Sequence, residues 1–435
     1  MTEAGAEFDP LQRILMLVPH DPDLDPRVGS SIELCRSIAR TEVIASTWAT
    51  QRPAKEYDGV VSVERVDAST NASDRARRAA ALGNRLDLRL STQEYKQHEG
   101  RPPDGMKARV RHHLGGVFRF AAAWSAYSML ISTLLRRASV VGVRPRVIIA
   151  HDIYALIPAA ILKQRWGCAL LYDAHEYFPA SDLLAPPWQM RVIRRLERHF
   201  IRKADRVVTV SPPLAAQLQR DYGVQNVIVV PNTEPVARVL SEIRPHDPAD
   251  QVRFLLQGQA APGRGFERLL DLWRELDDPR AVLQIRAPDW EYPRVLRERY
   301  QDLADRGRCE WLDPVVEDRL VEAAAAAEIG VIPYVGPNMN HLFACPNKLA
   351  QYMCAGLAVF SNNLPYVGSV IARFDCGLTY DADDSKTFLR AARRLIDEPD
   401  LRRRLRENAL AAAGVEYNWE QTSEPYRAAI SELFG

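Results

Sequence analysis

Short apolar, β-branched runs alternate with amphipathic helical patterns along most of the 435-residue chain. Helical stretches such as IELCRSIA and PLAAQLQRDYG carry apolar residues at i, i+3 and i+4. This order predicts a parallel sheet, and the nearly continuous apolar strands indicate helices on both of its faces. The first series of expected strands covers residues 13–18, 42–46, 60–66, 146–151, 169–175, 206–210 and 226–230.

The alternation begins again after a polar, proline-containing stretch, SEIRPHDPADQ. The second series of expected strands covers residues 254–258, 281–287, 309–312, 328–334 and 357–362. The sequence therefore predicts an α/β protein with two Rossmann-like, doubly wound domains, residues 1–235 and 250–415. A final amphipathic helix within residues 416–435 could pack on either domain.

Charge and cysteine content exclude several classes of protein. The 57 Lys and Arg nearly balance 56 Asp and Glu, and a formal charge of +1 argues against a nucleic-acid-binding protein. An anionic ligand must therefore be held by a few local groups. The six cysteines are scattered without a metal-binding pattern, so we expect buried, reduced thiols and no metal site.

The amino terminus, MTEAGAEFDPLQR, lacks the features of a secretory signal, and no run of 18 apolar residues occurs. We therefore expect a cytoplasmic protein. Residues 73–116 break the strand–helix rhythm with an excess of Lys and Arg. A solvated helical flap is the simpler interpretation of this insertion; peripheral contact with anionic lipid at the inner membrane face is the alternative.

A glycine-rich turn in the second half predicts an anion site. In FLLQGQAAPGRGFERLLDLW, a strand is followed by Gly258, Gly263 and Gly265, and a helix is expected to begin near Gly265. Such a turn leaves backbone N–H groups at a helix amino end, where the dipole favours an anion, and Arg264 adds a positive charge.

A second helix amino terminus is expected in HLFACPNKLAQYMCAGLAVFSNNLP, because Pro346 suits the first turn of a helix and Gly356 its end. Lys348 falls in the first turn, where a cation is unfavourable unless an anion compensates it. Gln351, one turn later, could hydrogen-bond a hydroxyl group. A surface lysine on a packed helix is the alternative for Lys348.

In the first half, HDPDLDPRVGSSIELC joins the first strand to the first helix. We expect Arg27 and Gly29 in this loop, at the carboxyl ends of the strands, where open α/β sheets bind ligands. The alternating Asp21, Asp23 and Asp25 could suggest a metal, but an Asx-rich start of a helix is the commoner pattern.

Ionisable residues end two neighbouring expected strands. His151 and Asp152 follow one strand, and His175 and Glu176 follow the next. Their position, more than their identity, indicates a ligand site. His175 could donate a hydrogen bond near neutral pH, and Glu176 could accept one.

As an ordered set, these motifs resemble the GT-B glycosyltransferases, and specifically the retaining family 4 group. The resemblance runs from RILMLVPHDPDLDPRV through VIIAHD, LLYDAHEYFP, ADRVVTVSPPLAAQL and VIVVPN to PNKLAQYMCAGLAV. It implies two Rossmann-like domains facing a central cleft. The C-terminal domain would bind a nucleotide-sugar donor, the N-terminal domain an acceptor, and the last helix would cross back to the N-terminal domain.

The resemblance also assigns roles and shows departures from the family. Arg264 matches one basic residue of the diphosphate contact, whereas its usual partner appears as Gln259. The two glutamates of the family's E-x7-E element are replaced by Phe343 and Gln351. The remaining implied donor contacts are His175, Lys348, the turn glycines Gly258, Gly263 and Gly265, Gly29, Pro346 and Asn347. Acceptor-side candidates are Arg27, His151, Asp152 and Glu176.

The implied reaction is transfer of a sugar from a UDP- or GDP-sugar to a small or lipid-linked acceptor with retained configuration. Arg264, Lys348 and two helix amino ends would stabilise the leaving diphosphate without a metal or cofactor, and His175 would orient the reacting groups. No carboxylate pair with glycosidase spacing is assignable, which disfavours double displacement. The alternative hypothesis, motivated by Gln259, Phe343 and Gln351, is a catalytically silent homologue that serves as a nucleotide-sugar-binding or partner subunit.

Overall fold

The computed structural model describes residues 12–47, 55–57, 59–68, 124–125, 127–180, 187–245, 251–335 and 339–435. The basic insertion expected at residues 73–116 lies outside these ranges. The chain forms two compact units. Unit 1 comprises Met1–Val210, Leu214–Val230 and Glu424–Gly435, and unit 2 comprises Ser211–Pro213 and Pro231–Ser423.

Unit 1 contains an eight-stranded sheet in the order β3-β4-β2-β1-β5-β6-β7-β8. Its strand pairs are parallel except β3 with β4. All expected strands are confirmed, but β3 was not predicted, because its three residues, KEY, carry no apolar run. The strands are β1 (Arg13–Val18), β2 (Arg40–Thr47), β3 (Lys55–Tyr57), β4 (Val61–Asp67), β5 (Val147–His151), β6 (Ala169–Ala174), β7 (Arg206–Thr209) and β8 (Ile228–Val229).

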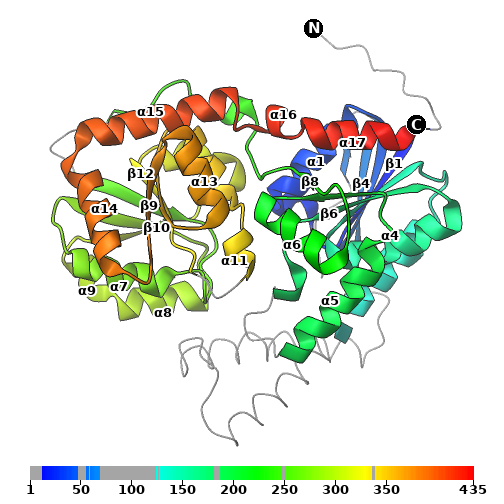
Figure 1. The fold of residues 1–435 in the computed structure, drawn as a ribbon, viewed down its shortest axis with the longest axis horizontal. Coiled ribbons are helices and arrows are strands. Elements are labelled where there is room, and N and C mark those ends of the chain that lie inside the picture. Colours follow the sequence, from blue (N-terminus) through cyan, green and yellow to red (C-terminus); the bar gives the residue numbers. More distant parts are fainter. Residues whose placement is uncertain are drawn as a thin grey trace, which may run out of the picture. The chain divides into compact units, whose positions relative to one another are not determined.

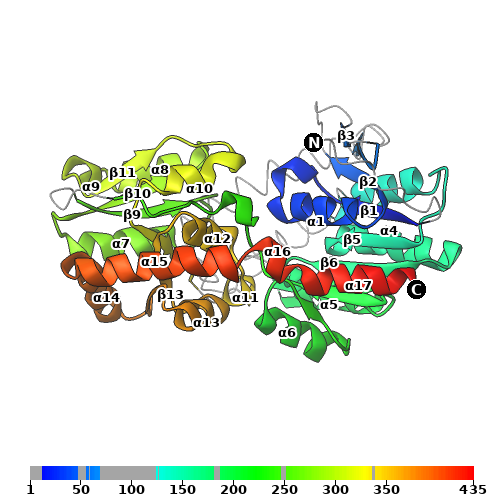
Figure 2. The same cartoon turned by 90° about the horizontal axis from the view of Figure 1, so that it is seen from above.

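Helices flank both faces of this sheet (Figures 1 and 2). The strand side chains between them are almost fully buried; in β1, every residue after Arg13 is buried. The helical segments are η1 (Pro22–Leu24), α1 (Pro26–Arg36), α4 (Asp152–Trp166), η2 (Phe178–Ala180), α5 (Pro187–Ile201), α6 (Pro212–Tyr222) and α17 (Glu424–Phe434).

Unit 2 contains a six-stranded, fully parallel sheet in the order β11-β10-β9-β12-β13-β14. The five expected strands are confirmed. The short strand β14, GLTY, was not predicted, because it lacks a continuous apolar run. The strands are β9 (Val252–Gln257), β10 (Ala281–Arg286), β11 (Cys309–Leu312), β12 (Ile329–Ile332), β13 (Ala358–Asn362) and β14 (Gly377–Tyr380).

Helices also cover both faces of the second sheet (Figure 2). Helix α7 packs against α14, and α12 packs against α15. The helical segments are η3 (Val236–Arg238), α7 (Phe266–Leu276), α8 (Glu291–Arg299), α9 (Gln301–Asp305), η4 (Glu317–Arg319), α10 (Leu320–Ala324), α11 (Met339–Phe343), α12 (Asn347–Cys354), α13 (Pro365–Phe374), α14 (Ser385–Asp397), α15 (Pro399–Val415) and α16 (Trp419–Thr422).

The carboxyl-terminal segment differs from the single helix expected there. It forms α16 and α17, separated at Ser423. Pro425 has no N–H group, so it cannot extend the hydrogen-bond ladder of α16. Helix α17 belongs to unit 1, where it contacts β5, β6 and β8 and its Tyr426 is completely buried.

The cysteine prediction is confirmed, because all six thiols are buried and none forms a disulfide within the described part of the chain. Among the described residues, no helix combines the length and the apolar character needed to cross a membrane.

Candidate functional site

The carboxyl edge of the unit 1 sheet gathers the ionisable residues expected there. Strands β5 and β6 pair in register, with His151 opposite Asp173. His175 follows β6 directly, and Asp25 lies in the segment that joins β1 to α1. The sequence prediction that these strand ends come together is therefore correct.

Arg27 is a buried structural cation rather than an exposed acceptor contact. The expectation that Arg27 and Gly29 lie in a loop is wrong, because α1 already begins at Pro26. The Nε and Nη2 atoms of Arg27 donate to the Asp173 carboxylate at 3.0 and 2.7 Å, and Nη1 donates to the Val230 carbonyl at 2.8 Å. Only 4% of Arg27 is exposed and Asp173 is fully buried.

His175 is surrounded by carboxylates. Its Nδ1 lies 3.5 Å from Asp25 and 3.6 Å from Asp152, and its Nε2 lies 3.7 Å from Asp173. Burial alone would lower the pKa of His175, but the three carboxylates outweigh it and hold the pKa well above 6.5. His175 is therefore an imidazolium near neutral pH.

His151 is the neutral partner of this imidazolium. Its Nδ1 lies 2.9 Å from His175 Nε2, and burial lowers the pKa of His151 to about 3. A protonated His175 must donate across this contact, so His151 Nδ1 accepts and its proton resides on Nε2. His151 Nε2 is buried without a hydrogen-bond partner in the described part of the chain.

Among the described residues, His151, Asp173 and His175 have ligand atoms close enough to hold a metal ion, within 4.8 Å of one another. The surroundings disfavour a cation, because Arg27 already binds both oxygens of Asp173 and His175 is itself positively charged. The geometry instead suits a cluster of mutually paired ions, in which Arg27 and His175 lie among the carboxylates.

The remaining acidic residues of the β1–α1 segment stabilise the local backbone. Asp21 and Asp23 pair with Arg65 at 3.1 and 2.8 Å. Asp25 caps α1 by accepting from the amides of Arg27 and Val28. The Asx-rich helix start expected as the commoner alternative to a metal site is thus what these residues form.

Asp152 adopts a left-handed backbone conformation, with φ of 60°. This conformation is costly for a non-glycine residue. Its carboxylate accepts from the His175 amide at 3.3 Å, which offsets part of that cost. Glu176 is half-buried at the same edge. Gly29 lies in the first turns of α1, and a Cβ atom there would meet nothing within 4 Å.

In unit 2, the glycine-rich turn after β9 forms as predicted. Helix α7 begins after Gly265, which has φ of 84°, and no side chain caps its amino end. A Cβ on Gly265 would lie 1.9 Å from the Pro333 carbonyl oxygen, so only glycine fits. Gly258 and Gly263 also have positive φ, and a Cβ on Gly258 would lie 3.8 Å from Lys348 Nζ.

Lys348 lies in the first turn of α12, as predicted, but it is not a surface lysine. Only 6% of the residue is exposed. Its Nζ lies 5.0 Å from the ring centroid of Tyr334 and, within the residues that the structure describes, has no hydrogen-bond partner. Burial and the nearby Arg264 lower the pKa of Lys348. Within the described ranges, the structure thus holds a buried cation without a protein counter-ion.

Arg264 and Lys348 are brought together. Burial would raise the pKa of the Tyr334 hydroxyl, but Lys348 and Arg264 outweigh it and lower that pKa. Arg264 is half-buried, and its Nη1 donates to the carbonyl of the exposed Gln259 at 3.5 Å. Two cations therefore meet at the carboxyl edge of the unit 2 sheet.

The α12 amino end supplies a further positive potential. Pro346 is its N-cap, with no side-chain cap, and the half-buried Asn347 is its first residue. Phe343 ends α11, and its carbonyl accepts from Ser211 Oγ at 2.5 Å. With α7, two uncapped helix amino ends thus lie beside the two cations.

Gln351 is engaged at both ends of its amide. Its Oε1 accepts from Gln257 Nε2 at 2.9 Å, and its Nε2 donates to Glu317 Oε1 at 3.0 Å. Arg286 Nη1 in turn donates to Gln257 Oε1 at 3.2 Å. Sequence analysis missed Gln257, Arg286 and Glu317. Gln257 and Arg286 are polar residues at the last positions of β9 and β10, and this placement could have indicated them.

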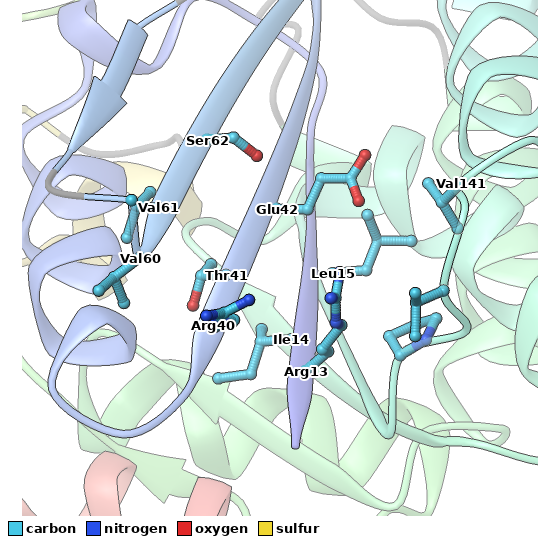
Figure 3. Close-up of a pocket in the computed structure, with 13 residues that line it drawn as sticks. Arg13, Ile14, Leu15, Arg40, Thr41, Glu42, Val60, Val61, Ser62 and Val141 are labelled. Atoms are coloured by element: carbon cyan, nitrogen blue, oxygen red, sulfur yellow. The ribbon is translucent and has the colours of Figure 1, made fainter. Parts of the chain in front are cut away.

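A pocket of about 170 Å³ opens at the opposite edge of the unit 1 sheet, at the amino ends of its strands (Figure 3). Arg13, Arg40 and Glu42 contribute the charged groups of its lining. Partial burial raises the pKa of Glu42. None of the residues expected to bind ligand lines this pocket, in agreement with the rule that parallel α/β sheets bind ligands at strand carboxyl ends.

Two family models match successive parts of the chain. The glycosyl transferase 4-like domain matches residues 68–233, and the glycosyl transferases group 1 model matches residues 241–411. The chain belongs to the GT-B glycosyltransferases. This assignment agrees with the two parallel-sheet units and confirms the family expected from the sequence motifs.

Curated GT-B relatives are similar over part of their length. A D-inositol 3-phosphate glycosyltransferase of Rhodococcus jostii is 24% identical over 305 residues, which is 62% of this chain and 63% of that protein. The corresponding protein of a Nocardioides species is 25% identical over 307 residues, 63% of this chain and 65% of that protein. The match thus spans less than two thirds of these relatives.

Solved GT-B structures share the fold over nearly the whole chain. Sucrose-phosphate synthase from Thermosynechococcus elongatus has a TM-score of 0.69 at 14% identity, covering 97% of this chain and 99% of that one. Anabaena HepE in complex with UDP and glucose has a TM-score of 0.64 at 13% identity, and the match covers 97% of this chain and 100% of that one.

Proposed function

We propose that this GT-B protein transfers a sugar from a nucleotide-sugar donor to a small or lipid-linked acceptor. The observation that carries the proposal is the buried Lys348, which has no counter-ion among the described residues, beside Arg264 and two helix amino ends without side-chain caps in unit 2. Removing an ammonium from water without a counter-ion is unfavourable, so the folded site favours an anion that neutralises it. A diphosphate supplies two adjacent negative groups.

The donor is proposed to be a UDP-sugar, with a GDP-sugar as the other candidate. HepE is described with bound UDP, and the trehalose-phosphate synthase of Burkholderia xenovorans is described as UDP-forming. The leaving nucleoside diphosphate gains charge in the transition state, and fixed cations and dipoles aimed at it lower the barrier. We propose transfer without a metal, because Arg264 and Lys348 supply positive charge at the proposed diphosphate site. We propose retention because the sequence motifs resemble those of the retaining family 4 group.

Titration calorimetry with UDP and GDP tests the donor site. Arg264→Ala should weaken UDP binding at least about tenfold, because a charge-assisted hydrogen bond is worth about 1.5–3 kcal/mol. Arg274→Ala, at the other end of α7 and paired with Asp302, is the matched control and should bind UDP as the unmodified protein does. Unchanged affinity in Arg264→Ala would show that the diphosphate binds elsewhere.

Turnover distinguishes an enzyme from a silent homologue. Purified protein incubated with a panel of UDP- and GDP-sugars should release nucleoside diphosphate, faster with a suitable acceptor. Anomeric analysis of the product by NMR tests retention, and unchanged turnover in excess EDTA tests metal independence. UDP binding without turnover of any donor would favour the silent nucleotide-sugar-binding subunit instead.

A further inference from the structure

A row of buried polar side chains runs from a cation to a carboxylate across the carboxyl edge of the unit 2 sheet. Arg286, Gln257 and Gln351 are each less than 10% exposed, and Glu317 of η4 ends the row at the surface. The row crosses four separate elements, β10, β9, α12 and η4, so it forms only in the folded unit.

The direction of every hydrogen bond in this row is fixed by Arg286. A guanidinium can only donate, so Gln257 Oε1 must accept from it. Gln257 Nε2 therefore donates to Gln351 Oε1, and Gln351 Nε2 must point onward to Glu317. Inverting either amide would place two donors or two acceptors against each other.

This polarity changes what Gln351 can offer a ligand. Its oxygen already accepts a hydrogen bond from Gln257, and its amide nitrogen is turned toward carboxylates, including that of the buried Glu234. The acceptor group at this end of the row is Glu317. One of its oxygens, Oε1, is held by Gln351, while no described residue donates a hydrogen bond to Oε2.

Glu317 lies next to the proposed diphosphate site. Gln351, which holds it, is three residues after Lys348 on α12, and side chains with this spacing lie on the same face, about 5–6 Å apart at Cβ. Glu317 is thus joined, through Gln351, to the helix that carries Lys348. Arg286 Nε, like Lys348 Nζ, is buried and unpartnered among the described residues.

We propose that Glu317 accepts hydrogen bonds from the ribose hydroxyls of the nucleotide, with Gln351 as the positioning residue that holds its carboxylate. This inference rests on the proposed nucleotide-sugar function. The ribose is favoured over the transferred sugar because the nucleoside stays on the protein through the reaction, which suits a carboxylate fixed by a rigid row of hydrogen bonds. An ionised carboxylate accepts from both hydroxyls of a vicinal diol.

Calorimetry with UDP and with 2′,3′-dideoxy-UDP tests the proposal on the full chain. The unmodified protein should bind UDP at least about tenfold more tightly than the dideoxy compound. Glu317→Ala should lower the affinity for UDP to that for the dideoxy compound and leave dideoxy binding unchanged. The carboxylate and the ribose hydroxyls are the two partners of one interaction, so once either is removed the loss of the other has no further effect. Glu317→Gln, which retains an acceptor oxygen, should recover part of the discrimination.

The matched control is Glu322→Ala on α10, which removes the same charge from a surface glutamate paired with Arg319. It should bind both compounds as the unmodified protein does. Equal weakening of both compounds by Glu317→Ala, or no weakening of either, would overturn the ribose contact. An effect on UDP-sugar binding without an effect on UDP would place Glu317 at the transferred sugar and also overturn it. Failure of the unmodified protein to bind UDP or GDP would instead overturn the proposed function.

Discussion

The carboxyl edges of the two sheets balance their buried charges in opposite ways. In unit 1, the buried guanidinium of Arg27 meets Asp173, and the His175 imidazolium lies among three carboxylates. In unit 2, Lys348 is equally buried but has no carboxylate partner among the described residues. An edge whose buried cations all have carboxylate partners is stable without a ligand, whereas an edge with an unpaired buried cation favours an anion from outside. This contrast supports the proposal that the diphosphate binds in unit 2.

The largest expected effect on folding is in unit 1. Arg27→Met should destabilise the protein by about 3–5 kcal/mol, because it leaves Asp173 as a buried charge without its main partner. Urea unfolding measures the loss, and hydrogen exchange of β5 and β6 peptides should show that it arises in unit 1. A loss below about 1 kcal/mol would mean that the pair is not what holds this edge together.

The space available for a Cβ atom at two glycines provides a second contrast between the units. Gly265→Ala should cost at least about 1–3 kcal/mol, because the Cβ would overlap the Pro333 carbonyl at a positive φ. Gly29→Ala in α1 is the matched control; it meets open space and should stabilise the helix by about 0.5–1 kcal/mol. Thermal and urea unfolding of both variants test this, and equal stability of the two would refute the steric argument.

Unit 1 should also lose stability as the pH is raised. The pKa of His175 is raised in the folded protein, so its contribution to stability is complete below the unfolded value of about 6.5 and is lost as pH rises through the folded pKa. His175→Gln should flatten this decline. Hydrogen exchange of β5 and β6 peptides, followed as the pH is raised from 6, measures it; an unchanged slope in the variant would assign the decline to another group.

The smallest expected effect on stability is that of replacing Lys348, and it tests the contrast between the two sheet edges most directly. Lys348→Met should leave the free energy of unfolding without ligand unchanged or slightly higher, because it removes a buried cation that has no protein counter-ion. The same variant should lose stabilisation by added UDP. A clear loss of stability without ligand would show that Lys348 has a structural partner and that the contrast between the two edges is smaller than described.

Periodicity predicted most of the fold because strands buried on both faces must be apolar along their whole length. The two elements that it missed, β3 and β14, are short edge strands without a continuous apolar run. The helix starts at Gly265 and near Pro346 were predictable from local backbone chemistry. Glycine extends the allowed dihedral angles at its position, and proline restricts them.

The candidate site was predicted only in part. Arg264, Lys348 and His175 stood out because charge next to a glycine-rich turn, in a helix's first turn or at a strand end is unusual on local grounds. The role of Arg27 was misjudged, because its partner Asp173 is 146 residues away. Gln351 was predicted to bind a hydroxyl group, and the contacts of its amide with Gln257 and Glu317 could not be predicted from the sequence, because those partners lie in distant segments.

The sequence by itself determined the two parallel-sheet units, their order and the local turns that present helix amino ends, because these depend on residues close together in the chain. Only the tertiary structure decided which charges are neutralised and which are not. Burial and pairing depend on side chains that fold together from distant segments, such as Arg27 with Asp173 and Arg286 through Gln257 and Gln351 to Glu317.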